Sequence, residues 1–319
     1  MREIVEIPLT GTNGSSGMSG HARAVATVHR PALSPRSTTV ILLNAGHVPR
    51  NGHGGLPVNI ADTLCEQGWP VVRVDLPGLG DSPGSLPERI EAFWLDLKNG
   101  AHASLAAGVS DWAKDALGKE NIALGGVCGA AVTAVFTAHR YPGKVQSLLL
   151  IEPELFESEP AAEAEQPFAG SSGAAEALSA AEAFACDCKV TARLGPSWRL
   201  MRLLSRRRGK YRWLGRLQGM ILRMVSTPGE IPARANLALV EAWAEVAGRG
   251  VPSLVMTAEG LLWEAYFRQS RHAVFRGRED GVLHIAVPGA NHVFSNAAAK
   301  AAVLETVPAW LEGIQPEHQ

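Results

Sequence analysis

A strand, a sharp turn and a helix are compressed into one short stretch of the sequence. The apolar run 121–124 predicts a strand, and the small-residue run 130–138 predicts a helix. Between them Cys128 lies at the apex of the turn, with Gly126 and Ala130 at the two positions where larger side chains would collide. The pattern therefore predicts that Cys128 projects above the strand end, beside free backbone N–H groups at the start of a helix.

Two interpretations of Cys128 follow from this position. Free cysteine is among the most buried residue types, so a core thiol in a tight strand–helix turn is one of them. The other is a nucleophile, because the helix dipole favours a thiolate and the free N–H groups can hold a developing oxyanion. A nucleophile also needs a base and an orienting acid. The choice between a core thiol and a nucleophile therefore depends on whether the rest of the chain supplies them.

Strands alternate with helices along most of the chain. Most of the expected strands are apolar on both faces, which is typical of a parallel sheet covered on both sides. Strands are expected at 2–9, 22–30, 38–43, 69–75, 121–124, 144–152, 251–257 and 281–287. Helices are expected at 56–67, over much of 88–117, and at 130–138, 236–248 and 297–314. The fold class predicted is α/β, with a mostly parallel central sheet and helices on both faces.

A change in composition marks an insertion into this alternation. Residues 1–156 and 251–319 form the predicted core, and 157–250 the insertion, which begins with an Ala-, Glu- and Ser-rich segment. Residues 189–223 hold eleven Lys and Arg and no acidic residue, with Trp198 and Trp213 interleaved. This stretch is either a solvated helical face or an amphipathic helical lid. As a lid it would bring Trp198 and Trp213 to the substrate and attract an anionic acyl carrier protein, coenzyme A ester or membrane surface.

The carboxyl ends of the predicted strands supply the partners that Cys128 would need. His292 follows the last strand and is the expected base. Glu152 ends the strand after the nucleophile and is the favoured orienting acid, with Glu259, after the next strand, as the alternative. The resulting chain order is nucleophile, acid and histidine, as expected for a nucleophile on a turn of this kind.

The loop after the first buried strand is the expected source of the remaining groups. An oxyanion hole needs a second donor beside the Gly129 N–H, and the His47 N–H is the best placed, with Gly46 allowing close backbone approach. Arg50 and His53 lie in the same loop. They either contact substrate at the mouth of the pocket or belong to a surface turn.

Together these motifs resemble the α/β-hydrolase superfamily. The resemblance rests on the turn around Cys128, the Asn44-Ala-Gly loop, Asp75-Leu-Pro-Gly-Leu-Gly-Asp-Ser and Gly289-Ala-Asn-His-Val. Asn44-Ala-Gly-x-Val-Pro-Arg-x-Gly and Gly126-Val-Cys-Gly-Ala are similar to bacterial hydrolases of the serine-aminopeptidase-like group. The resemblance implies a hydrolase fold with a helical lid. Cysteine replaces the usual serine, and the usual acid position after the penultimate strand reads Leu261, which favours Glu152.

A cysteine at this position implies acyl transfer through a covalent thioester. Thioesters react with water, alcohols, amines and carbon nucleophiles, so the chain is expected to be a hydrolase of an ester, thioester or lactone, with an acyltransferase or ring-closing cyclase as the alternative. A non-catalytic binding protein of the same fold is a further alternative. No metal or organic cofactor is indicated.

Charge and hydropathy narrow the class of protein. The formal net charge of −1 provides no general attraction to nucleic acid. No apolar run approaches the roughly 20 residues of a membrane span, and the first residues lack the apolar core of a secretion signal. The four cysteines are irregularly spaced, so we expect a reducing, cytoplasmic location rather than a disulfide framework.

Overall fold

The structure is a computed structural model that describes residues 1–9, 22–32, 35–154, 235–260 and 278–314, together with 264, 267, 268, 271, 274 and 275. The expected basic lid segment, including Trp198 and Trp213, lies outside these described residues.

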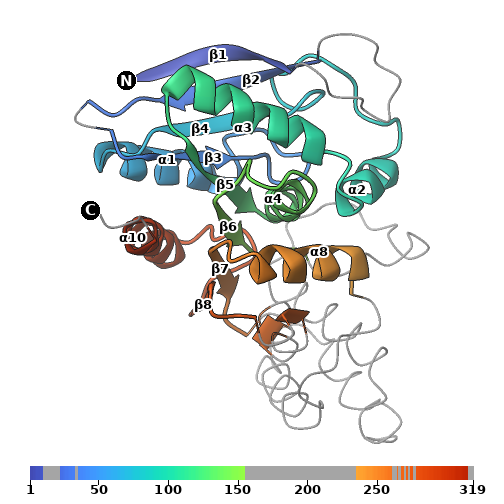
Figure 1. Cartoon of the computed structure of the whole chain (residues 1–319), viewed down its shortest axis with the longest axis vertical. Helices are drawn as coiled ribbons and strands as arrows, with labels where there is room; N and C mark the ends of the chain where they lie inside the picture. Colours follow the sequence, from blue (N-terminus) through green and yellow to red (C-terminus); the bar gives the residue numbers. More distant parts are fainter. Residues whose placement is uncertain are drawn as a thin grey trace, which may run out of the picture.

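One eight-stranded sheet forms the centre of the protein, in the order β1-β2-β4-β3-β5-β6-β7-β8 (Figure 1). β1 pairs with β2, and β2 with β4, in antiparallel register, and every pair from β4 to β8 is parallel. This confirms the mostly parallel sheet that the sequence predicts. The strands are Arg2–Leu9 (β1), Ala22–His29 (β2), Thr38–Leu42 (β3), Val71–Asp75 (β4), Asn121–Val127 (β5), Ser147–Ile151 (β6), Ser253–Ala258 (β7) and Val282–Val287 (β8).

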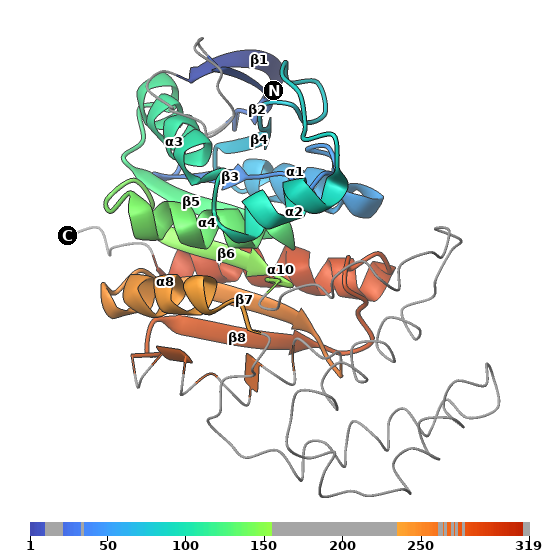
Figure 2. The same cartoon turned by 90° about the vertical axis from the view of Figure 1, so that its right-hand side faces the viewer.

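Helices cover both faces of the sheet. In Figure 1, α1 and α10 lie on one side, and α4 and α8 on the other; Figure 2 shows the same layers turned by 90°. Two separate apolar clusters result, one under α3, α4 and α8 and one under α1 and α10. The helices are Leu56–Glu66 (α1), Ile90–Lys98 (α2), Ala103–Leu117 (α3), Gly129–Arg140 (α4), Leu237–Gly248 (α8) and Ala297–Gly313 (α10), with a short 3-10 helix, η1, at His53–Gly55.

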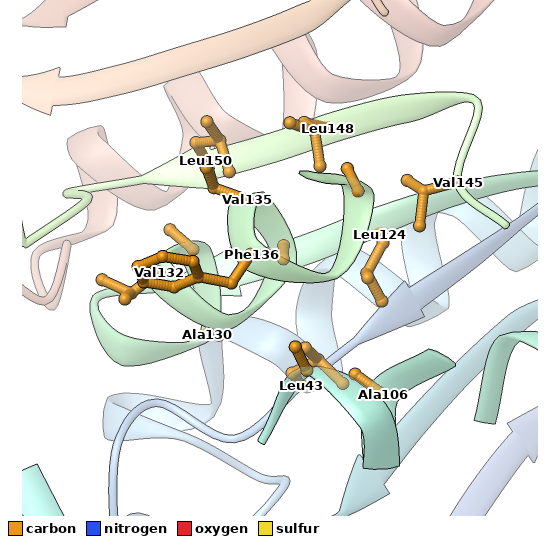
Figure 3. Close-up of a cluster of buried hydrophobic side chains, with 14 of the residues drawn as sticks. Leu43, Ala106, Leu124, Ala130, Val132, Val135, Phe136, Val145, Leu148 and Leu150 are labelled. Carbon is orange, nitrogen blue, oxygen red and sulfur yellow. The ribbon is translucent and has the colours of Figure 1, made fainter. Parts of the chain in front are cut away.

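Helix α4 is the most deeply enclosed of these helices. Its residues from Gly129 to Ala138 are all buried, because α4 packs on the sheet and is flanked by α3 and α8. The small residues of this helix allow that close approach. Figure 3 shows its apolar side chains against those of β5 and β6: Ala130, Val132, Val135 and Phe136 with Leu124, Leu148 and Leu150. The helix that starts at Cys128 is therefore held firmly in the core.

Helix α8 closes the same layer from a segment that the sequence assigned to the insertion. It packs against α4. Asn236 caps it, accepting a hydrogen bond from the Leu239 N–H at 3.0 Å and donating from its amide to the Lys98 carbonyl at 2.8 Å. The end of the predicted insertion is thus packed on the sheet and joined to α2. No helix among the described residues is both long and apolar enough to span a membrane.

A buried histidine links β2, β4 and α1. His29 is 1% exposed; its Nε2 accepts a hydrogen bond from Arg73 Nε at 3.1 Å, and its Nδ1 lies 3.2 Å from Asp62 Oδ1. Burial, with the charge of Arg73, lowers the pKa of His29 to about 4, against the opposing effect of Asp62. His29 is therefore neutral in the folded protein at pH 7.

This lowered pKa predicts a loss of stability in weak acid. Unfolded His29 regains a pKa near 6.5, so between pH 6.5 and 4 the unfolded chain binds the extra proton and the stability present above pH 6.5 is lost as the pH falls. After allowance for solvent screening, His29 should account for about 1–2 kcal/mol of the difference in unfolding free energy between pH 7 and pH 5. Urea unfolding of the wild type and His29→Gln at both pH values measures it; equal pH dependence in the two proteins would contradict the assignment.

Candidate active site

The turn between β5 and α4 holds Cys128 in a strained backbone conformation. Cys128 has φ 56° and ψ −116° and lies directly before the first residue of α4. Its backbone N–H donates to the Ile151 carbonyl of β6 at 2.8 Å, so the turn is tied to the neighbouring strand. Its side chain is half-buried. The structure therefore places the thiol at the helix start that the sequence predicts.

Glycines on either side of Cys128 make this turn possible. Gly126 has φ +141°, and a Cβ there would lie 2.7 Å from the Ala130 Cβ. A Cβ on Gly129 would lie 2.7 Å from Leu97 Cδ1 and 2.9 Å from the Gly46 nitrogen. The start of α4 is therefore in direct contact with the loop after β3.

Non-glycine residues with a positive φ cluster at the end of the sheet where Cys128 lies. Within the described ranges, positive φ outside glycine occurs at Cys128, at Glu152 (47°) and at Phe294 (51°), two residues after His292. Such strain costs of order 1–3 kcal/mol per residue and persists where the surroundings impose it, which is commonly at functional sites.

Glu152 and His292 meet beside Cys128. Glu152 follows β6 and is fully buried, and its Oε2 lies 3.4 Å from Nδ1 of His292, in the loop after β8. Its other oxygen accepts the backbone N–H of Ala258 in a short hydrogen bond. His292 also hydrogen-bonds to Cys128. The three side chains thus form a chain of contacts, whereas Glu259 is exposed to solvent.

The charges of this chain act on one another. Burial lowers the pKa of His292, but hydrogen bonds to Cys128 and Glu152 outweigh burial and raise the pKa well above the usual 6.5. Burial raises the pKa of Glu152, and the contact with His292 opposes that rise. The surroundings of His292 therefore stabilise a proton on the imidazole, which enables it to take up the thiol proton of Cys128.

The loop after β3 brings backbone N–H groups to the same place. The Val48 N–H donates to the Ala45 carbonyl at 3.2 Å, which makes a tight turn containing Gly46 and His47. The ring of His47 is exposed and lies edge-on to Trp94 of α2, with centroids 5.8 Å apart. Because the Gly46 nitrogen lies beside Gly129, this turn borders the start of α4 as an oxyanion loop would.

A buried polar network anchors this loop to β4. Asp75 Oδ1 accepts hydrogen bonds from Asn44 Nδ2 at 2.8 Å and from the Arg50 N–H at 2.6 Å. Asn44 Oδ1 accepts the Leu76 N–H at 2.7 Å. The Arg50 guanidinium binds Asp75 and Thr27 and also reaches Asp81.

This network gives Arg50 a structural role that the sequence did not predict. Its side chain is 9% exposed and holds the loop to β4. The loop sequence alone does not show that Asp75, at the end of β4, lies within reach of Arg50; contact of Arg50 with substrate stays a prediction.

His53 lies near His292, and its contact with substrate stays a prediction. It is exposed in η1, and partial burial together with the charges of His292 and His47 lowers its pKa. A small recess beside it is lined by Ala45, Gly52, His53, Leu56, Pro57, Val127 and Val293. His53 thus lies close to both His292 and His47.

A second carboxylate near the thiol was not anticipated. Glu154 Oε2 lies 3.9 Å from Cys128 Sγ, and its Oε1 lies 3.3 Å from Lys98 Nζ, at the end of α2. Glu154 lies two residues after Glu152, just beyond the end of β6. This closeness in sequence is the signal that could have indicated a role for Glu154. Nothing in the sequence places α2 beside it.

Comparison with known proteins names the fold. The sequence model of the family described as "alpha/beta hydrolase fold" matches residues 38–182, the span that contains β3, Cys128 and Glu152. Similar solved structures extend the likeness over nearly the whole chain. The chain has the α/β-hydrolase fold.

Three solved structures with this hydrolase fold illustrate the likeness. Est1E from Butyrivibrio proteoclasticus, with ferulic acid bound, is 14% identical with a TM-score of 0.54, covering 97% of this chain and 98% of that chain. Proline iminopeptidase from Mycobacterium smegmatis is 16% identical with a TM-score of 0.52, covering 98% and 96%. Dienelactone hydrolase from Anabaena variabilis is 12% identical with a TM-score of 0.50, covering 98% and 97%. At these identities the likeness shows the fold alone, and no curated protein sequence matches the chain.

Proposed function

We propose that the protein is a hydrolase that cleaves an ester, thioester or lactone through a covalent acyl-enzyme on Cys128. The observation that carries the proposal is the contact chain from buried Glu152 through His292 to Cys128, at the start of a buried helix. Such a chain of acid, imidazole and nucleophile is the arrangement that activates a side chain for attack on a carbonyl.

In the first step the thiol proton passes to His292. Since Nδ1 faces Glu152, the nitrogen that accepts this proton is Nε2. Sγ then attacks the carbonyl carbon, a carbon–sulfur bond forms, and the carbonyl electron pair moves onto oxygen. The N–H groups of Gly129 and His47 are proposed to hold that oxyanion.

In the second step the tetrahedral intermediate collapses. The bond to the leaving alcohol or thiol breaks, the leaving group takes the proton from His292, and the acyl group stays on Sγ as a thioester. Water then attacks the thioester carbon and gives a proton to His292, and Sγ leaves as thiolate. Return of this proton from His292 to Sγ restores the thiol and the neutral imidazole.

The acceptor of the acyl group decides which reaction the protein catalyses. An amine, an alcohol or an internal carbon nucleophile in place of water would make the protein an acyltransferase or a cyclase. The basic run 189–223 supports an anionic donor, an acyl carrier protein or a coenzyme A ester. Est1E, with ferulic acid, and dienelactone hydrolase share the fold and are consistent with ester or lactone chemistry.

Intact-mass analysis tests the acyl-enzyme. After brief incubation with p-nitrophenyl acetate, we expect one acetyl adduct that maps to Cys128, and Cys128→Ala should lose the adduct and slow turnover by roughly 10³-fold or more. Repeating the incubation with an amine acceptor separates hydrolysis from transfer by the products.

The non-catalytic alternative makes the opposite prediction. An adduct equally abundant in Cys128→Ala, or ester turnover unaffected by that substitution, would refute the role of Cys128. Circular dichroism of both proteins verifies that the variant is folded.

A further inference from the structure

Cys128 has a second hydrogen-bond partner that the proposed mechanism does not use. Glu154 Oε2 lies 3.9 Å from Sγ, within reach of the thiol S–H. The Glu154 side chain is only 16% exposed and that of its partner Lys98 only 9%. The acid for His292 is already provided by Glu152, so Glu154 acts at the thiol itself rather than through the imidazole.

Acylation changes what Glu154 can bind. In the free protein its Oε2 accepts the thiol proton, but a thioester sulfur has no proton to donate. A largely buried carboxylate oxygen that loses a donor is costly unless the substrate replaces it. In the acyl-enzyme, a substituent on the carbon next to the carbonyl is separated from Sγ by only two carbons, so it lies in the part of the site that Oε2 borders.

The charge of the pair selects the kind of donor. Lys98 Nζ, 3.3 Å from Oε1, compensates the negative charge of Glu154. The pair is therefore neutral as a whole, and a second cation beside it would be buried near Lys98. A neutral hydroxyl donor fits this site better than an ammonium group.

We propose that Glu154, held by Lys98, makes the protein selective for acyl groups that carry a hydroxyl on the carbon next to the scissile carbonyl. The inference rests on the proposed function, because it assumes that the acyl group is attached to Cys128. It makes Glu154 a specificity-determining residue, and 2-hydroxyacyl esters or thioesters the preferred substrate class.

Matched esters test this preference. The p-nitrophenyl esters of propionate, 2-hydroxypropionate and 2-aminopropionate differ only at the carbon in question, and each kcat/KM is divided by the rate of hydroxide-catalysed hydrolysis. The wild type should favour the hydroxy ester over the plain ester by roughly 10- to 100-fold, as expected for a hydrogen bond to a charged acceptor. The double substitution Lys98→Met with Glu154→Leu removes both charges of the pair together, and the ratio should then fall to near unity.

A second ion pair provides the control. Lys144 and Asp111 are paired between α3 and the loop before β6, with both side chains more than 40% exposed. Lys144→Met with Asp111→Leu should leave the substrate ratio as in the wild type.

The outcomes separate this inference from the proposed function. No preference in the wild type, a preference kept by the Lys98/Glu154 double variant, or a stronger preference for the amino ester would overturn the role of Glu154. Absence of turnover for all three esters, or turnover that does not depend on Cys128, would instead overturn the proposed function.

Discussion

Replacing Glu152 by Gln should lower kcat for ester hydrolysis by roughly 10³- to 10⁴-fold. The reason lies in the hydrogen bond from the Ala258 N–H to Oε1, because the glutamine carbonyl must take that place. The amide NH₂ then faces Nδ1 of His292, which must become the acceptor. The imidazole proton is consequently held on Nε2, the nitrogen that should receive the thiol proton. Pre-steady-state release of p-nitrophenol measures the acylation rate directly.

Glu259→Gln is the matched control for this experiment. Glu259 follows the adjacent strand and is exposed, so its substitution should change kcat by less than twofold. A Glu152→Gln protein that keeps kcat within tenfold of the wild type, or an equal loss in Glu259→Gln, would refute the assignment of the acid. Thermal unfolding of both variants excludes loss of fold as the cause.

Replacing Asp75 by Ala should cost about 3–5 kcal/mol of unfolding free energy, the largest stability effect that we expect from one substitution. The Asp75 side chain is fully buried. It binds both the backbone N–H and the guanidinium of Arg50. Its loss leaves Arg50 buried without its main counter-ion, and it frees Asn44 in the loop that contains His47. Urea unfolding followed by circular dichroism measures the change.

Asp81 tests whether burial is the cause. It also binds the Arg50 guanidinium, at 2.7 Å, but its side chain is 70% exposed. Asp81→Asn should therefore cost less than about 1 kcal/mol. Equal losses at the two positions would show that the loop is not anchored through the buried carboxylate.

Much of the sheet could be predicted because its strands are continuous apolar runs. Thr38–Leu42 and Ser147–Ile151 are wholly buried, as the absence of a polar face indicates. The positions of Cys128, Glu152 and His292 followed from the same reasoning, since parallel strands end at one edge of the sheet. The sequence does not predict that β1 pairs antiparallel with β2, and β2 with β4, because hydrophobic pattern alone does not determine strand direction.

Contacts between segments far apart in the sequence could not be predicted. The structural role of Arg50 depends on Asp75 and Thr27, which reach it only when β2, β4 and the loop after β3 are assembled. The Lys98–Glu154 pair depends in the same way on where α2 ends relative to β6. Neither set of contacts can be inferred from local residue patterns.

The hydrogen bonds at the ends of β5 and β6 determine how the geometry of this site can be lost. The Cys128 N–H donates to the Ile151 carbonyl and the Glu152 N–H to the Met256 carbonyl, each at 2.8 Å, so both residues continue the hydrogen-bond ladder of the sheet. Their separation is set by neighbouring central strands, which open to hydrogen exchange only with the whole domain. Local fluctuations of surface loops can alter access to the thiol, but the spacing of Cys128 and Glu152 is lost only in the cooperative unfolding of the sheet.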